Sequence, residues 1–268
     1  MDSLLLILSI TIYELVSLFG FIIIFGFVLG ILRKKTLGNL YSAFGKNIIY
    51  ITGIIGTPIH EVGHAIMCLI FTHKVKKIKL FNFNGGDILG YVNHSYNKNN
   101  LYQRIGNLFI AIGPIFSGIF VIFITLYVFV PDSFKFFFEY YSKSINSETL
   151  ILSTEYFKTF GNFTLDFLST ILSKINTLGF WIFFIICFSV SLHMSLSRKD
   201  MEGFIDGFIS LTVLLLVLNS FLVIIGYDST KLIASLFLTN IYIISFLLIS
   251  LIFSFISFFI GLIINKIF

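Results

Sequence analysis

The sequence predicts an all-α integral membrane protein with about six transmembrane helices and a small β-hairpin loop after the second of them. Of the 268 residues, 57% are hydrophobic and only 12% are charged, whereas a soluble domain usually carries about 25% charged residues. This number of charged residues is too small to cover a water-facing surface. Most of the surface must therefore face lipid. The apolar residues are spread from one end of the chain to the other. We therefore expect a single membrane-embedded domain over residues 1–268, in a multi-pass protein of the cell membrane.

Six apolar segments are long enough, or nearly so, to cross the hydrocarbon core, which takes about 20 helical residues. They cover residues 4–32, 48–71, 105–130, 178–196, 208–227 and 232–264. Helices are the expected structure because every backbone donor and acceptor must be satisfied within a segment that lipid surrounds. The first and last segments are long enough to be tilted or to extend beyond the bilayer.

Two connections between these segments have recognisable patterns. Residues 72–104 contain two short stretches of alternating or aliphatic residues around Asn84-Gly85-Gly86-Asp87, and such turn residues between short strands predict a β-hairpin. The hairpin serves either as an edge to which an extended substrate adds as a strand or as a structural connector. Residues 132–177 are aromatic, weakly charged and rich in Ser, Thr and Asn, which favours an interfacial loop and helix.

The charged residues and cysteines suggest no further partner. The net charge is +5, but the basic residues fall in short segments between apolar runs, such as Arg33–Lys35 and Lys74–Lys77. Charges in such places meet lipid headgroups, so we expect no nucleic-acid partner. Cys68 and Cys187 lie within apolar runs and are expected to be buried as small hydrophobic residues.

The pentapeptide His60-Glu61-Val62-Gly63-His64 carries the clearest chemical signal. Histidines four residues apart lie one turn apart on the same face of a helix, where both imidazoles can hold one Zn²⁺. Glu61 points about 100° away from His60 and is expected to act as general base on a zinc-bound water. Gly63 removes bulk, so that another helix or a substrate can approach. Because an uncompensated acidic group inside a span costs roughly 3 kcal/mol, a functional role is expected.

A hydrolytic zinc site needs three protein ligands and one open position, so a third ligand must come from elsewhere in the chain. The candidates are histidines and acidic residues near the ends of apolar segments. They are His73, His94, His193, Asp200, Glu202 and Asp206. On a continuous helix His73 would lie about 13 Å beyond His64, which is too far for a bond of roughly 2 Å.

The order of these features resembles the site-2 proteases, a family of intramembrane zinc metalloproteases. Those enzymes have a His-Glu-x-x-His helix, an extended loop, a span with a Gly-Pro pair, and a later motif that supplies an aspartate as third ligand. In this chain the His-Glu-x-x-His motif is followed by the 72–104 loop, then by Gly113-Pro114, and then by residues 192–200, where serines replace two prolines of the family motif. The resemblance implies that Asp200 joins the two motif histidines as a zinc ligand.

Ser197 gives physical support for Asp200. A serine three residues before the aspartate can cap the following helix and hold the aspartate in its first turn, where the helix dipole stabilises an anion. Asp206, which is followed by a glycine, and His193 remain alternatives. His94 could also fold back toward the motif.

These features together predict a zinc-dependent endopeptidase that cleaves membrane-associated or transmembrane substrates within the bilayer, with a membrane-anchored protein as its partner. One alternative is another integral-membrane zinc protease, in which a glutamate on a later helix is the third ligand. The predicted spans beyond the motif contain no glutamate, and the remaining glutamates are expected in loops (Glu139, Glu148, Glu155 and Glu202). Another alternative is a metal transporter or sensor, but such a protein would place acidic residues or histidines along several spans. The predicted spans 105–130, 208–227 and 232–264 contain none.

Overall fold

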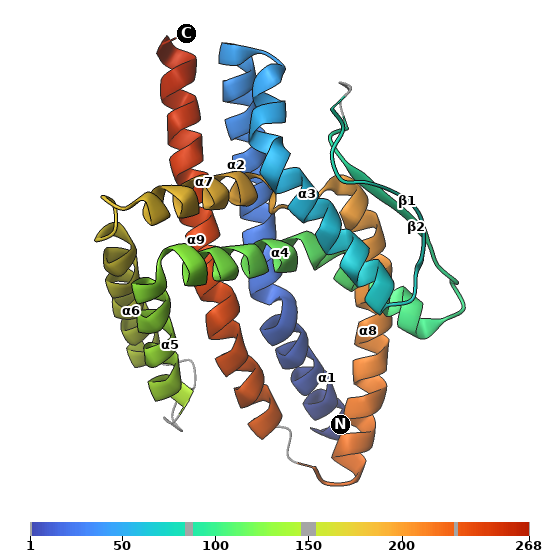
Figure 1. Ribbon diagram of the computed structural model, residues 1–268. Helices are drawn as coiled ribbons and strands as arrows, with labels where there is room; N and C mark the ends of the chain where they lie inside the picture. The colour runs from blue at the N-terminus through green and yellow to red at the C-terminus, as the bar shows by residue number, and fades with distance from the viewer. Residues whose placement is uncertain (1, 84–87, 146–153, 228–229, 268) are drawn as a thin grey trace.

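The structure, a computed structural model, describes residues 2–83, 88–145, 154–227 and 230–267 (Figure 1). Most of these residues are helical, and the Asn84–Asp87 turn of the predicted hairpin lies outside them. The elements in chain order are α1 (Asp2–Leu15), the π-helical turn η1 (Val16–Gly20), α2 (Phe21–Phe44), α3 (Asn47–Ile70), β1 (Lys74–Lys79), β2 (Tyr91–Ser95), α4 (Leu101–Phe129), α5 (Pro131–Ile145), α6 (Thr154–Leu172), α7 (Leu178–His193), α8 (Arg198–Ile224) and α9 (Thr230–Ile267).

Five helical stretches within the described residues are long and apolar enough to cross a membrane. They are Ser3–Phe44, in which α1, η1 and α2 follow one another, Asn47–Ile70, Leu101–Phe129, Asp200–Ile224 and Ile243–Ile267. The fourth apolar segment of the sequence forms α7, which is equally apolar but has only 16 residues. The chain is therefore an integral membrane protein with five candidate spans, and the predicted number of about six is not confirmed.

Large apolar side chains cover much of the outer surface of these helices. Phe27, Leu69 and Ile224, for example, are 68%, 70% and 82% exposed. In water so much exposed apolar surface would drive association, whereas in a bilayer it faces acyl chains. Polar side chains are instead buried between helices, as where Nδ2 of Asn219 on α8 donates a hydrogen bond of 2.7 Å to Glu14 on α1.

The helix α4 lies at the centre of the molecule. It packs against α3, α7 and α8, and its buried side chains include Leu108, Ile112 and Ile115. The helices α2 and α9 lie side by side, as do α1 and α8, and in Figure 1 both α4 and α7 cross the direction of α9. This arrangement brings α3, α4, α7 and α8 together in one region.

Glycines allow α3 and α4 to approach closely where they cross. A Cβ atom on Gly63 would lie 2.5 Å from the carbonyl oxygen of Gly113, and one on Gly113 would lie 2.6 Å from the carbonyl oxygen of Gly63. This contact confirms the expectation that Gly63 makes room for another helix. It also places α4 directly against the histidine motif of α3.

The predicted hairpin is present as an antiparallel pair of strands, β1 and β2. Lys74 pairs with Ser95 and Lys79 pairs with Tyr91, with an irregularity in the register between Val75 and Lys77. The hairpin follows α3 immediately and lies beside it in Figure 1.

The connection predicted as an interfacial loop and helix contains two helices, α5 and α6. Aromatic side chains pack them together, since the ring of Phe137 on α5 contacts those of Phe163 and Phe167 on α6. Phe137 also contacts Phe246 on α9. Through this contact the pair of helices α5 and α6 packs against α9. Both helices come well after the histidine motif in the sequence.

Candidate metal centre

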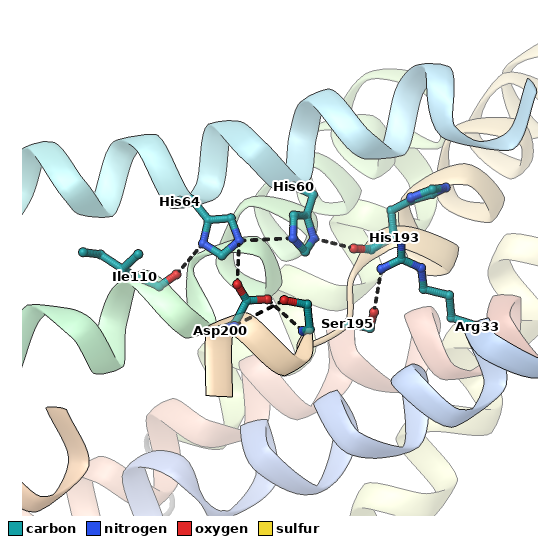
Figure 2. Close-up of polar contacts among 8 residues, drawn as sticks. Arg33, His60, His64, Ile110, His193, Ser195 and Asp200 are labelled. Atoms are coloured by element: carbon teal, nitrogen blue, oxygen red, sulfur yellow. Dashed lines mark hydrogen bonds and ion pairs between the residues drawn. The ribbon is translucent and has the colours of Figure 1, made fainter. Parts of the chain in front are cut away.

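Two histidines and an aspartate converge where α3 meets the start of α8 (Figure 2). The Nε2 atoms of His60 and His64, one turn apart on α3, lie 3.1 Å from each other. Oδ1 of Asp200, in the first turn of α8, lies 3.3 Å from Nε2 of His64. The three donor atoms all lie within 4.8 Å of one another. Two imidazole nitrogens and one carboxylate oxygen form a donor set typical of catalytic zinc sites.

Hydrogen bonds to the backbone determine which nitrogen of each ring faces the centre. Nδ1 of His60 donates to the carbonyl oxygen of His193 at 2.7 Å, and Nδ1 of His64 donates to that of Ile110 at 2.7 Å (Figure 2). Because a carbonyl oxygen can only accept, each neutral ring carries its proton on Nδ1 and turns the lone pair of Nε2 toward the centre. Two lone pairs at 3.1 Å repel each other unless a cation lies between them. The arrangement therefore fits a metal ion, whose histidine ligands usually donate their other N–H in this way.

Pro114 explains why the carbonyl oxygen of Ile110 can accept a bond from His64. In an α-helix this oxygen would accept from the backbone N–H four residues later. The residue at that position is Pro114, which has no N–H. The Gly113-Pro114 pair thus has two separate effects, since the glycine lets α3 approach and the proline leaves a carbonyl oxygen available to orient His64.

The first turn of α8 orients the carboxylate of Asp200. Its Oδ2 accepts a hydrogen bond of 2.7 Å from the backbone N–H of Ser197, while its own N–H donates to the Ser197 hydroxyl at 3.2 Å. This reciprocal pair is a capping box, and it confirms that Ser197 caps the helix. With Oδ2 used in the cap, Oδ1 is the oxygen that points to the histidines.

Glu61 lies beside the three donor atoms and is not one of them. Its side chain is buried and lines the same cavity as the two histidines. The segment leading into β2 packs closely on it, since a Cβ atom on Gly90 would lie 2.8 Å from Cγ of Glu61. This position suits a group that acts on a molecule held at the centre.

A cavity of about 820 Å³ opens beside the centre. Its walls include His60, Glu61 and His64, residues 88–94 before and within β2, and Arg33 of α2. Nη1 of Arg33 donates to the Ser195 hydroxyl at 3.1 Å (Figure 2). From the sequence, Arg33 is expected to meet lipid headgroups together with its basic neighbours, so the sequence does not predict that Arg33 lies at the site. Its position there becomes clear only from the packing of α2 against α7.

Two alternative ligands lie in other networks. Asp206 accepts a hydrogen bond from Nη2 of Arg104 at 3.0 Å, and Tyr96 and Asn107 each donate to it at 3.2 Å. His193 contributes its carbonyl oxygen to His60, while Nδ1 of its ring lies 3.3 Å from the hydroxyl of Thr57. Neither side chain belongs to the His60–His64–Asp200 group.

The remaining candidates are also separate from this group. His73 and His94 lie near Cys68 in a second cluster of possible ligands. Glu139, Glu155 and Glu202 lie in the helices α5, α6 and α8, which corrects the expectation that they fall in loops. Glu202 is exposed, and Glu148 lies outside the described residues.

Comparison with known protein families, with curated proteins and with solved structures found no match to this chain.

Proposed function

We propose that this protein is a zinc-dependent endopeptidase that cleaves membrane-anchored proteins within the bilayer, in the manner of the site-2 proteases. One observation carries the proposal. The donor atoms of His60, His64 and Asp200 converge, with Glu61 beside them, in helices whose outer surfaces are apolar. The proposal includes a location in the cell membrane and a sixth membrane-embedded helix, α7, which supplies the carbonyl oxygen that orients His60.

Zinc is the metal that this donor set favours. Imidazole and carboxylate ligands suit zinc, and a set of three protein ligands leaves the fourth position open for water or substrate, as in catalytic zinc sites. The lone pairs that face one another at the centre, and the backbone carbonyls behind the two rings, support a resident cation. Bound zinc would supply Lewis acidity, which polarises a peptide carbonyl and makes water a stronger acid.

Glu61 is the general base in this proposal. Its carboxylate takes a proton from water as the oxygen attacks the peptide carbonyl carbon, and then gives that proton to the leaving nitrogen as the C–N bond breaks. A carboxylate that ligated the metal would be less able to carry the proton, so its place beside the donor group matters. Arg33, in the wall of the same cavity, adds a positive charge near the carbonyl oxygen, which becomes negative during the attack.

The hairpin is the proposed substrate-positioning element. Residues 91–94 of β2 line the cavity, so an extended segment of substrate that pairs with this strand would lie next to the centre. A helical membrane substrate must unwind before its carbonyl can be attacked, and pairing with a strand would hold the unwound segment. If β2 serves only as a connector, substitutions on its cavity face will leave substrate affinity unchanged.

Replacing Glu61 by Gln tests the proposed function. We expect Glu61→Gln to lower cleavage of single-span peptides in lipid vesicles by about 100- to 10,000-fold, as is typical for loss of a general base, while the zinc content stays at the wild-type value. Glu202→Gln is the matched control, because this exposed carboxylate on α8 lies outside the site. Turnover by Glu61→Gln within about tenfold of the wild type would rule out Glu61 as the base.

A further inference from the structure

A second group of possible metal ligands lies at the end of α3 next to the hairpin. The group consists of Cys68, His73 and His94, whose donor atoms all lie within 4.8 Å of one another. Cys68 is fully buried and His73 is 5% exposed. The group shares no residue with the His60–His64–Asp200 centre, and it contains a sulfur donor that the first centre lacks.

The local structure of the chain brings these three side chains together. Cys68 follows His64 by one helical turn, on the same face of α3. The helix ends at Ile70, and Thr72 turns the backbone back with a φ of 56°. The N–H of His73 can then donate to the carbonyl oxygen of Cys68 at 2.8 Å. The pairing of Val75 with His94 in the hairpin adds the third member of the group.

A backbone carbonyl orients the ring of His73, as carbonyls orient the two rings of the first centre, but here the donor is the other ring nitrogen. Nε2 of His73 donates to the carbonyl oxygen of Gln103 at 2.7 Å, so the neutral ring presents the lone pair of Nδ1 to the group. Nδ1 of His94 lies 3.0 Å from that atom. This distance fits two nitrogens that share a cation, and it also fits a direct hydrogen bond in which Nδ1 of His94 donates to His73.

The three side chains offer one sulfur and two nitrogen donors. Such a set favours borderline-soft cations such as Zn²⁺, and the donor atoms lie close enough together to share one ion.

We propose that Cys68, His73 and His94 form a second zinc site, which fastens the hairpin to the end of α3. The bound ion would hold β2 in place where residues 91–94 line the cavity of the first centre. Coordination releases the Cys68 thiol proton to water and forms a bond from the thiolate to the metal, with no change of oxidation state. The proposal does not depend on the proteolytic function, because the second site would bind zinc whether or not the first one acts on peptides.

Cobalt substitution tests this site with a signal that the first centre cannot give. The full-length protein in detergent is stripped of metal and titrated with Co²⁺. A cobalt ion bound by a thiolate has a charge-transfer absorption band in the near ultraviolet, which a site of histidine and carboxylate ligands lacks. We expect this band in the wild type and in a His60→Ala/His64→Ala variant. The band should be lost in Cys68→Ser and retained in Cys187→Ser, which replaces the other buried cysteine.

The possible outcomes separate the two explanations of the His73–His94 contact. The absence of the band from metal-saturated wild-type protein would overturn the proposal and leave a direct hydrogen bond between the rings. A band that survives in Cys68→Ser, or that disappears with Cys187→Ser in protein that remains monodisperse, would also overturn it. Loss of the band only in the His60→Ala/His64→Ala variant would contradict two independent sites.

Discussion

At the scale of single residues, the three donor atoms of the first centre are each held by a contact outside the centre. Two backbone carbonyls fix the rings of His60 and His64, and the capping box with Ser197 fixes Asp200. A site whose side chains are already oriented loses little conformational entropy when a metal binds. The centre is thus preorganised by α4, by the end of α7 and by the start of α8.

Asp200 and Asp206 provide a matched pair of substitutions for the third ligand. Asp200→Asn should weaken zinc binding by more than about 100-fold, beyond the roughly 10- to 100-fold typical for losing a hydrogen-bond partner of a ligand. The amide oxygen can still accept the hydrogen bond from the N–H of Ser197, so the capped start of α8 should remain intact. Asp206→Asn weakens the contact with Arg104 and should leave zinc affinity unchanged.

Competition with a chromophoric chelator measures these affinities. Both substitutions are made in a Cys68→Ser background, so that the cysteine-containing group does not contribute zinc. The assignment of Asp200 would be wrong if its variant kept wild-type affinity, or if Asp206→Asn had the larger effect.

The sequence predicts which side chains converge at the first centre better than it predicts the groups that orient them. The spacing of His60 and His64 follows from one helical turn, and Ser197 indicates where the capped helix begins. The carbonyl oxygens of Ile110 and His193 and the guanidinium of Arg33 come from segments far away in the chain. Backbone carbonyls have no residue-specific signal, so only the packing of the helices reveals them.

At the scale of elements, the crossing of α3 and α4 positions the site. Gly63 and Gly113 face each other there, and the Ile110 carbonyl oxygen reaches His64 because the two helices are so close. Any side chain at the crossing would separate the helices and weaken that hydrogen bond. The geometry of the candidate metal centre therefore depends on a contact that includes none of its three donor residues.

Substituting Gly63 tests this dependence. In Gly63→Ala the new methyl group would lie 2.5 Å from the carbonyl oxygen of Gly113, so we expect a loss of about 1–3 kcal/mol of stability from overpacking. Zinc affinity should fall by roughly 10- to 100-fold as the orienting bond to His64 weakens. Gly38→Ala on α2 is the control, because a Cβ atom there meets nothing within 4 Å, and it should raise stability slightly. Thermal unfolding in detergent measures the stability of both variants against the wild type. A Gly63→Ala variant as stable as the wild type would refute the role of the crossing.

The elements themselves are largely predictable from hydropathy and turn residues. Five apolar segments form helices long enough to span a membrane, and the hairpin lies within the predicted loop. The remaining segment, 178–196, is shorter as a helix than its apolar run, because α7 ends at His193, before the capped start of α8. Hydropathy does not register such a break, since Met194 and Leu196 are as apolar as the residues of the helix.

At the scale of the whole molecule, a polar site is enclosed by helices with apolar outer surfaces. Exposed apolar side chains face outward on α2, α3 and α8, while the cavity beside the centre has histidine, glutamate, aspartate and arginine side chains in its walls, together with apolar ones. The polar groups of the site therefore lie among helices whose outer surfaces suit lipid. This arrangement is what a peptidase acting within a membrane needs.

The most direct measurement is the chemical analysis of fragments from a single-span peptide incubated in vesicles with the zinc-loaded wild-type protein in isotopically labelled water. The account predicts that a peptide bond within the apolar segment is cut and that the new carboxylate carries one labelled oxygen from water. It also predicts that neither zinc-depleted protein nor Glu61→Gln produces these fragments. The account would be contradicted by wild-type protein that cuts no such peptide while holding zinc, by cuts confined to the water-exposed tails, or by fragments that persist after zinc removal.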